Sequence, residues 1–219
     1  MNEVIKKSMP LGALMNNIKC GIKIVSGNID KEIASVEYDS RKVNDKALFI
    51  AVPGFVTDGH LYVKDAVEKG AGAVLVSDSK AGEFKDSITN GTVVLAASDT
   101  RRALSAFSAA VFGNPTSKAP VIGITGTNGK TSITYMIEAV LRDFGMRPGV
   151  VGTVNYRWKD KVVSAPNTTP ESRDLQEIFA NMIADGVNVI VMEVSSHALK
   201  LFRVEDIDFN IAAFTNLTR

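Results

Sequence analysis

The sequence has a single cysteine, Cys20, among its 219 residues. One thiol excludes an intramolecular disulfide framework and a zinc site made of cysteines alone, and it suits the reducing cytoplasm, where we expect the protein to act. Long apolar runs are also missing. No stretch approaches the roughly 20 apolar residues of a membrane-spanning helix, and the apolar residues near the start are interrupted by Gly12, Asn16 and Asn17. We therefore expect neither a signal peptide nor a membrane segment.

The sequence also lacks an excess of charge of either sign. Its 25 lysines and arginines stand against 24 aspartates and glutamates, for a net charge of +1, so we expect no binding of nucleic acid. The hydrophobic content of 45% and the charged content of 22% are ordinary for a globular protein, and the length is sufficient for one or two domains. We expect a monomer that acts on small molecules.

The first part of the chain alternates short apolar runs with helical segments. The pattern predicts strands at residues 47–52, 73–76 and 93–95, a loop over 53–59 and a helix over 60–69. Gly70 is suited to end that helix. These elements predict a small mixed α/β domain, which we place at residues 1–97.

Strands and helices alternate again over residues 98–219. The pattern predicts helices at 101–112, 130–144 and 172–184 and strands at 121–125, 150–154, 187–193 and 211–215, with a polar loop before the third helix. The strand at 187–193 is apolar on both faces, as a central parallel strand covered by helices should be. This alternation predicts a doubly wound α/β domain. The last strand has no following helix to cover it, so we expect a fragment of a longer protein.

A glycine-rich stretch, GITGTNGKTS at residues 123–132, lies between a predicted strand and a predicted helix. The common phosphate-loop pattern needs a glycine where this chain has Ile124. Gly126 and Gly129 nevertheless allow the backbone to turn its N–H groups toward a phosphate without side-chain clash, and the helix dipole favours an anion. The alternative is a plain glycine turn, but the agreement of strand, turn and helix favours a nucleotide.

The residues that follow these glycines suit a triphosphate. Lys130 can place its ammonium group against the outer phosphates, and Thr131 can offer a hydroxyl to a magnesium ion that bridges phosphate oxygens. Asn128 tolerates the tight turn between the glycines. The predicted ATP-binding residues are Gly126, Thr127, Asn128, Gly129, Lys130, Thr131 and Ser132.

The loop GTNGKTS with a strand before it resembles the ATP site of the Mur ligases and of the related folylpolyglutamate synthases, whose glycine spacing it shares. Three further segments, at residues 38–43, 48–60 and 66–76, resemble the uridine-nucleotide-binding domain of the MurE and MurF types. NTTPE at 167–171 and MEVSSHAL at 192–199 are similar specifically to the MurE type. The resemblance covers essentially all of the chain, in order, and under half of a full-length enzyme.

The resemblance implies an ATP-dependent amide ligase of peptidoglycan synthesis. Its first domain would bind UDP-N-acetylmuramoyl-L-alanyl-D-glutamate, and its second would be a truncated ATP-binding domain. The glutamyl carboxylate would react with ATP to give an acyl phosphate, which the amine of a diamino acid, meso-diaminopimelate or L-lysine, then attacks. ATP and Mg²⁺ are the implied cofactors. The 219-residue chain itself is expected to bind its substrates without turnover.

The resemblance also implies roles for individual residues. Lys130 and Glu193 would be catalytic, and Glu193 would hold the metal with Thr131. Glu193 follows an apolar strand, so its carboxylate should lie at the carboxyl edge of the sheet, where α/β ligands bind; the alternative is a solvated strand-end glutamate. The implied substrate contacts are Tyr38, Ser40, Phe55, Val56, Thr57, Asn167, Thr168, Thr169, Ser195 and Arg203. Ser40 could instead be a turn residue and Arg203 a surface charge.

Three other functions compete with this interpretation. Another ligase of the superfamily, of the MurF type or a folylpolyglutamate synthase, is disfavoured by the segments at 167–171 and 192–199. A binding module without turnover would hold the UDP-muramoyl peptide alone. A phosphate-loop ATPase or switch would need a second acidic motif of the usual hydrophobic-run-plus-aspartate type, but the strand here ends in Glu193.

Overall fold

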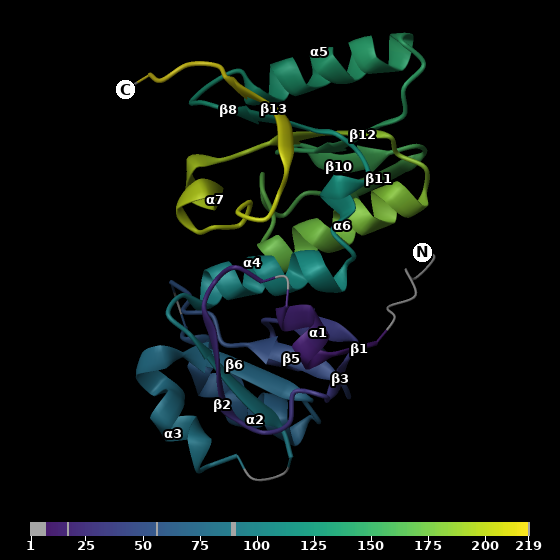
Figure 1. Ribbon diagram of the computed structural model, residues 1–219. Coiled ribbons are helices and arrows are strands. Elements are labelled where there is room, and N and C mark those ends of the chain that lie inside the picture. The colour runs from purple at the N-terminus through teal and green to yellow at the C-terminus, as the bar shows by residue number, and fades with distance from the viewer. Residues whose placement is uncertain (1–7, 17, 56, 89–90, 219) are drawn as a thin grey trace. The chain divides into compact units, whose positions relative to one another are not determined.

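The computed structural model describes residues 8–16, 18–55, 57–88 and 91–218 (Figure 1). The chain divides into two compact units, one within Ile5–Val111 and the other within Phe112–Arg219. The division lies later than the predicted boundary near residue 97, because helix α4 (Thr100–Val111) belongs to the first unit. Its residues Leu104 and Phe107 are fully buried in that unit's core.

The first unit contains a five-stranded sheet with the strand order β2-β7-β6-β5-β4. Its strands are β2 (Ile22–Ser26), β4 (Ser35–Glu37), β5 (Ala47–Ile50), β6 (Ala73–Ser77) and β7 (Val93–Ala97). The strands β4 to β7 are parallel, and β2 runs antiparallel to β7. A separate ladder pairs β1 (Met9–Pro10) with β3 (Glu32–Ile33). The predicted strands at 47–52, 73–76 and 93–95 are confirmed, with small differences at their ends.

Helices cover both faces of this sheet. They are α1 (Leu11–Met15), α2 (Val63–Glu68), α3 (Ala81–Lys85) and α4, with short 3-10 turns η1 (Ser40–Lys42), η2 (Gly59–Tyr62) and η3 (Asp78–Lys80). Leu48 and Ile50 share a core with α1 and α4, whereas Phe49 shares one with α2 and α3. Successive side chains of a strand point to opposite faces, so a strand between two helical layers is apolar throughout. The predicted helix at 60–69 is divided between η2 and α2.

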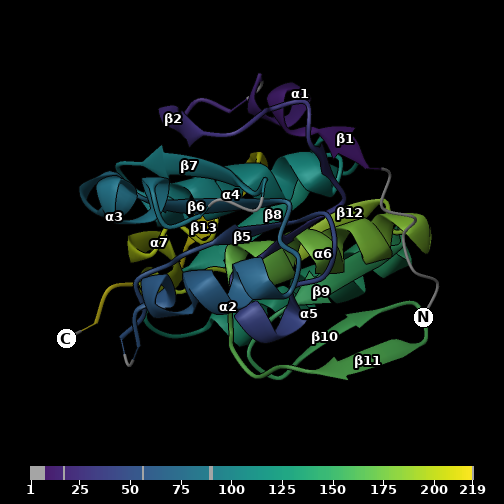
Figure 2. The same ribbon diagram turned by 90° about the horizontal axis from the view of Figure 1, so that it is seen from below.

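The second unit contains a six-stranded sheet with the order β11-β10-β9-β12-β8-β13. Four strands are parallel: β8 (Val121–Thr125), β9 (Pro148–Val151), β12 (Val189–Glu193) and β13 (Phe209–Phe214). Helix α5 (Lys130–Asp143) covers one face and α6 (Ser172–Ala184) the other (Figure 1, Figure 2). The turn η4 (Pro115–Ser117) precedes β8, and α7 (Ser196–Lys200) follows β12. A doubly wound α/β arrangement was predicted and is confirmed.

One predicted segment of this unit is wrong. The expected polar loop after the strand at 150–154 contains a hairpin of β10 (Asn155–Trp158) and β11 (Lys161–Ser164), and the strand itself ends earlier, at Val151. Tyr156 and Trp158 point into the core formed with α6. The two-residue turn places Lys159 at a φ of 52°, without the Asn-Gly or Asp-Gly pair that usually marks such turns. The hairpin therefore has no strong local signal.

No helix in the described part of the chain combines the length and the apolar character needed to cross a membrane.

Candidate active site

The glycine-rich loop connects β8 to α5, as predicted. Gly126 and Gly129 have positive φ angles of 127° and 85°, which glycine adopts readily and other residues rarely do. A Cβ atom on Gly126 would also lie 2.1 Å from the Thr215 Oγ1 atom, whereas one on Gly129 would meet nothing within 4 Å. Glycine is therefore needed at position 126 because of both the backbone conformation and the lack of space for a side chain. At position 129 it is needed because of the backbone conformation alone.

The residues after β13 hold the loop in place. The N–H group of Thr127 donates to the carbonyl of Asn216 at 2.9 Å, and that of Asn128 donates to the Asn216 Oδ1 atom at 3.1 Å. The Thr215 hydroxyl donates to the carbonyl of Asn128 at 2.7 Å. Sequence reasoning missed this contact, because it joins residues nearly ninety positions apart. The N–H groups of Thr127 and Asn128 are therefore occupied within the protein.

Lys130, the first residue of α5, turns its ammonium group back onto the loop. Its Nζ atom donates to the carbonyl of Gly126 at 2.7 Å and to that of Thr127 at 3.1 Å. The positive charge thus lies beside the loop's backbone.

Glu193, the last residue of β12, is only 2% exposed. Its carboxylate accepts hydrogen bonds from the Thr131 hydroxyl at 3.1 and 3.0 Å, from the N–H group of Thr153 at 3.0 Å and from the Thr153 hydroxyl at 2.9 Å. The alternative of a solvated strand-end glutamate is therefore wrong. The structure brings Glu193 and Thr131 together, and each of these three donor groups is neutral.

Two residues beside Glu193 were missed by sequence reasoning. A Cβ atom on Gly152 would lie 2.3 Å from the Glu193 Oε1 atom, so the backbone passes too close for any side chain. Thr153 follows directly. The only local signal for these two residues is a Gly-Thr pair after an apolar strand. The local sequence does not show that β9 is the neighbour of β12, because strand order is a property of the whole sheet.

The loop at residues 167–169 lies next to this carboxylate. The Thr168 Oγ1 atom lies 3.1 Å from the Thr153 Oγ1 atom, and Asn167 is exposed. Thr169 is only 1% exposed, and its hydroxyl donates to the Glu193 carbonyl while it accepts from the N–H group of Ser195. Its side chain ties the loop to the end of β12 and does not face solvent.

Ser195 and Arg203 lie at the same edge of the sheet. The Ser195 hydroxyl accepts from the N–H group of Ala198 and so caps α7. The Arg203 guanidinium donates to the carbonyl of Thr169 at 3.0 Å and lies 3.3 Å from the Glu171 carboxylate. The alternative of a free surface charge does not hold for Arg203, because it is bound to the 167–169 loop. His197 is exposed on α7.

The implied uridine contacts lie in the first unit. Ser40 is buried, and its hydrogen bond, followed by that of Lys69, lowers the pKa of the Asp65 carboxyl. Tyr38 is half-buried against the core. Phe55 is 76% exposed, and the Thr57 hydroxyl bonds with that of Tyr62 at 3.2 Å. Val56 lies outside the described residues.

A buried histidine supports the end of the 53–59 loop. The N–H group of Ser77 donates to His60 Nε2 at 2.9 Å, so the ring proton lies on Nδ1 and donates to the Asp58 carboxylate at 2.6 Å. Lys80 donates to the same carboxylate at 2.7 Å. Burial alone would raise the pKa of Asp58, but the hydrogen bonds from Lys80 and His60 outweigh it and hold that pKa well below its usual value.

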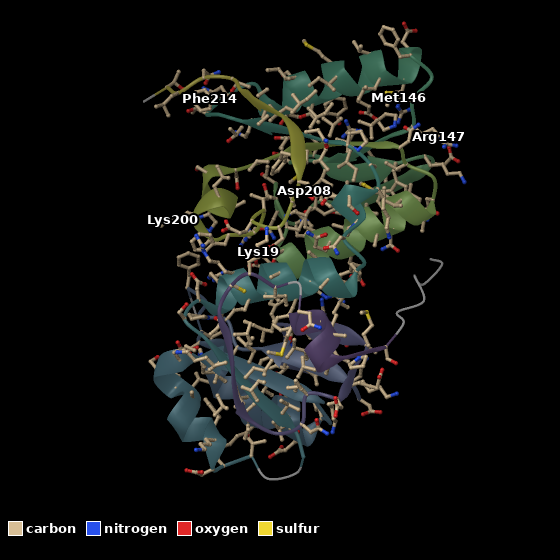
Figure 3. The ribbon with its side chains drawn as sticks, viewed as in Figure 1. Lys19, Met146, Arg147, Lys200, Asp208 and Phe214 are labelled. Carbon is tan, nitrogen blue, oxygen red and sulfur yellow. The ribbon has the colours of Figure 1, made fainter. Side chains whose placement is uncertain are left out.

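A cavity of about 360 Å³ lies away from these residues. It is lined by the end of α5, the start of β9 and the hairpin turn, including Met146 and Arg147 (Figure 3). β9 begins there at Pro148, whereas the glycine loop and Glu193 lie at the carboxyl ends of their strands. Ligands of α/β sheets bind at the carboxyl ends, so we place the active site at the loop and not at this cavity.

Comparisons with known proteins match both units of the chain. A family model of the Mur ligase family, catalytic domain, matches residues 32–111, and one of the Mur ligase middle domain matches residues 124–219. The UDP-N-acetylmuramoyl-L-alanyl-D-glutamate--2,6-diaminopimelate ligase of Caldanaerobacter subterraneus is 47% identical over 211 residues, which are 96% of this chain and 42% of that protein. The chain therefore spans less than half of that relative's length.

Solved structures show the same fold. One of a UDP-N-acetylmuramoyl-L-alanyl-D-glutamate--2,6-diaminopimelate ligase has a TM-score of 0.78 at 23% identity, over 97% of this chain and 41% of that one. The MurF ligase of Thermotoga maritima, solved in complex with ADP, has a TM-score of 0.55 at 17% identity, over 83% and 37% of the two chains. Sequence matches over both units and a common fold lead to one conclusion. The chain belongs to the Mur ligase family.

Proposed function

We propose that this chain is the substrate- and ATP-binding part of an ATP-dependent ligase of the MurE type. The observation that carries the proposal is the buried Glu193 carboxylate, which accepts hydrogen bonds from Thr131 directly behind the glycine loop. A buried anion with neutral donors, next to a phosphate-binding loop, suits a divalent cation and a triphosphate. The relative from Caldanaerobacter subterraneus, by its name, supports the choice of reaction.

The proposed ATP site consists of the loop and the first turn of α5. The first N–H groups of a helix have no intrahelical partner, so those of residues 130–132 can bind phosphate oxygens with help from the helix dipole. The Lys130 ammonium, now bonded to two loop carbonyls, would reach the outer phosphates after a rotation of its side chain. The ADP named in the Thermotoga maritima structure supports a nucleotide here.

The residues beside the loop fit Mg²⁺. This ion prefers oxygen ligands and usually keeps several waters and substrate phosphates in its coordination shell. We assign the Glu193 carboxylate and the Thr131 hydroxyl, which lie 3.0 Å apart, as the groups that hold it. When bound, Mg²⁺ supplies charge neutralisation at the phosphate oxygens. Such a site needs few protein ligands, in keeping with the described residues, which contain no group of three or more His, Cys, Asp or Glu suited to a metal.

We assign residues of each unit separately to the UDP-N-acetylmuramoyl-L-alanyl-D-glutamate substrate. We assign its uridine and diphosphate to Tyr38, Ser40 and the residues 55–57. Asn167 and Thr168 would contact the sugar-peptide part, together with Ser195 and Arg203. Thr169 would act through the backbone, because its hydroxyl already bonds within the protein. Arg203 can bind a carboxylate in a fork geometry, provided that it exchanges Glu171 for the substrate.

In the proposed reaction the free glutamyl carboxylate attacks the γ-phosphorus of ATP, so that an acyl phosphate forms and ADP leaves. The amine of the diamino acid then attacks the acyl carbon, and inorganic phosphate leaves. The approach of two anions to about 4 Å costs several kcal/mol at intermediate dielectric; Lys130 and the loop amides reduce this cost. The relative's name favours 2,6-diaminopimelate over L-lysine. The pathway would be cytoplasmic peptidoglycan synthesis, which supports cell shape and division.

Calorimetry on this chain tests the proposal. We expect binding of a non-hydrolysable ATP analogue with Mg²⁺ and, separately, of UDP-N-acetylmuramoyl-L-alanyl-D-glutamate. Lys130→Ala should lower the affinity for the nucleotide at least tenfold, because one charge-assisted contact is lost. The affinity for the UDP ligand should be unaffected. Lys159→Ala, on the hairpin turn away from the site, is the matched control. Loss of both ligands in Lys130→Ala, or no binding of either to the unaltered chain, would overturn the assignment.

A further inference from the structure

Thr153 makes two hydrogen bonds to the same carboxylate. Its N–H group donates to the Glu193 Oε1 atom at 3.0 Å, and its hydroxyl donates to the Oε2 atom at 2.9 Å. An ionised carboxylate is only an acceptor, so the direction of both bonds is settled. One residue therefore fixes both oxygens of Glu193, and with them the plane of the carboxylate.

The other donor to Glu193 cannot fix both oxygens in the same way. The Thr131 hydroxyl lies within 3.1 Å of both carboxylate oxygens. A hydroxyl has a single hydrogen, so it can donate to only one of them at a time, whether or not a lone pair of its oxygen holds a cation. Glu193 is 2% exposed, so water has little access to supply a further bond. Of the two threonines, Thr153 alone donates a separate hydrogen to each carboxylate oxygen.

Thr153 is also connected to the proposed substrate loop. Its hydroxyl has one hydrogen, which is directed at Glu193, so the 3.1 Å contact with Thr168 must be a bond that Thr168 donates. The three side chains form a directed chain from Thr168 through Thr153 to Glu193. Because donated and accepted bonds at one hydroxyl strengthen each other, the Thr168 bond reinforces the bond to Glu193.

We propose that Thr153 is a positioning residue that orients Glu193 for the metal and connects it to the substrate loop at Thr168. The inference rests on the proposed function, since it takes Glu193 to be a metal ligand. It gives a role to a residue to which the family resemblance assigns none. It predicts weaker binding of the nucleotide when Mg²⁺ is present and unchanged binding of the nucleotide alone.

The test is calorimetry of the ATP analogue AMP-PNP on this chain, with saturating Mg²⁺ and with EDTA. Thr153→Val keeps the size of the side chain and removes the hydroxyl. We expect the affinity with Mg²⁺ to fall about tenfold, the effect of losing one hydrogen bond to a charged group, and the affinity in EDTA to stay unchanged. Thr153→Ser should restore the unaltered behaviour. Thr116→Val removes a hydroxyl elsewhere in the unit and is the matched control.

Each outcome decides between the possibilities. An equal loss with Mg²⁺ and with EDTA in Thr153→Val, accompanied by a lower melting temperature, would mean a merely structural role and would overturn the inference. An unchanged affinity in both would overturn it too. If the unaltered chain binds AMP-PNP no better with Mg²⁺ than with EDTA, the metal assignment in the proposed function fails first.

A double-mutant cycle tests the connection to Thr168. We expect Thr168→Val to weaken Mg²⁺-dependent binding about threefold in the unaltered background and not at all in Thr153→Val, because neighbours in one hydrogen-bond chain are not independent. Additive effects of the two substitutions would contradict the connection.

Discussion

At the scale of single residues, the site depends on how closely the backbone approaches its functional groups. At both Gly126 and Gly152 a Cβ atom would come within 2.3 Å of another atom, but the atom that it would meet differs. At Gly126 the partner is the Thr215 hydroxyl, which holds the loop. At Gly152 it is the Glu193 carboxylate itself. A methyl group at either position must therefore move part of the site.

Gly152→Ala tests this requirement. We expect the Glu193 carboxylate to be displaced, so that Mg²⁺-dependent binding of AMP-PNP falls at least tenfold while the free energy of unfolding decreases by about 1–3 kcal/mol. Gly82→Ala is the control, because a Cβ there meets nothing within 4 Å and lies in α3, where alanine is favoured over glycine by roughly 0.5–1 kcal/mol. Calorimetry and urea denaturation measure the two effects. Binding that survives intact in Gly152→Ala would contradict the assignment of Glu193.

An ion pair beside the implied uridine site makes the stability of the protein depend on pH. Hydrogen bonds from the Arg41 guanidinium hold the pKa of Asp39 at about 2, below the ordinary 3.8. A lowered pKa in the folded state means that the ion pair stabilises the protein fully above about pH 4 and ceases to do so as the pH falls through 2. Arg41 is largely exposed, so solvent screening weakens the contribution of the ion pair to stability.

We therefore expect Asp39→Asn to lower the free energy of unfolding by less than about 1 kcal/mol at pH 7. Its difference from the unaltered chain should narrow between about pH 4 and pH 2, where the folded and unfolded states differ in protonation. Urea denaturation across this range measures both. At neutral pH the difference should also shrink at high salt. A difference that does not depend on pH would contradict the role of the ion pair.

At the scale of elements, a buried ion pair joins α5 to the hairpin. Glu138 on α5 accepts from Arg157 on β10 and from Arg142 one turn further along α5. Arg157 also lies over the ring of Tyr135, 3.9 Å from its centroid. Glu138 is 8% and Arg157 12% exposed at their side chains. The helix that begins at the glycine loop is thereby fixed to the strand that follows Thr153.

Removal of both partners should cost less than the sum of the costs of removing each one alone. We expect Arg157→Met or Glu138→Leu alone to destabilise the protein by about 3 kcal/mol, because each leaves a buried charge with too few partners. The double substitution should cost clearly less than the sum, since apolar side chains can replace a buried pair. Urea denaturation of the four proteins measures this. Additive losses would mean that the pair is not coupled in the folded state.

At the scale of the whole molecule, a stripe of apolar side chains is exposed along α5. Met136, Val140 and Phe144, the C-cap residue of α5, follow each other at intervals of four residues and are more than half exposed. They therefore lie on one side of the helix. The edge strand β13 also exposes Ile211 and Phe214, the latter labelled in Figure 3. Apolar patches and open strand edges of this kind favour association.

This exposure predicts self-association of the 219-residue chain, in contrast to the monomer expected from composition. We expect light scattering to show a mass that rises with concentration. The double substitution Met136→Lys with Phe144→Lys should restore the monomer mass, because charge opposes the burial of that face. Leu61→Lys, at an exposed apolar residue of the first unit, should have no effect. A monomer at all concentrations would contradict the prediction.

The sequence by itself determined the features that depend on neighbours along the chain. The glycine loop between strand and helix, the apolar strand that ends in Glu193 and the α/β class follow from local patterns, because spacing and apolar periodicity reflect contacts within a few residues. The resemblance of the 167–171 and 192–199 segments depended on such local motifs as well.

Only the tertiary structure decided which segments meet. β9 lies beside β12, and this order brings Thr153 to Glu193; β13 lies beside β8, which brings Asn216 to the loop. The core contacts of α4 set the division between the units. Strand order and helix docking minimise exposed apolar surface over the whole sheet, so no short stretch of sequence contains them.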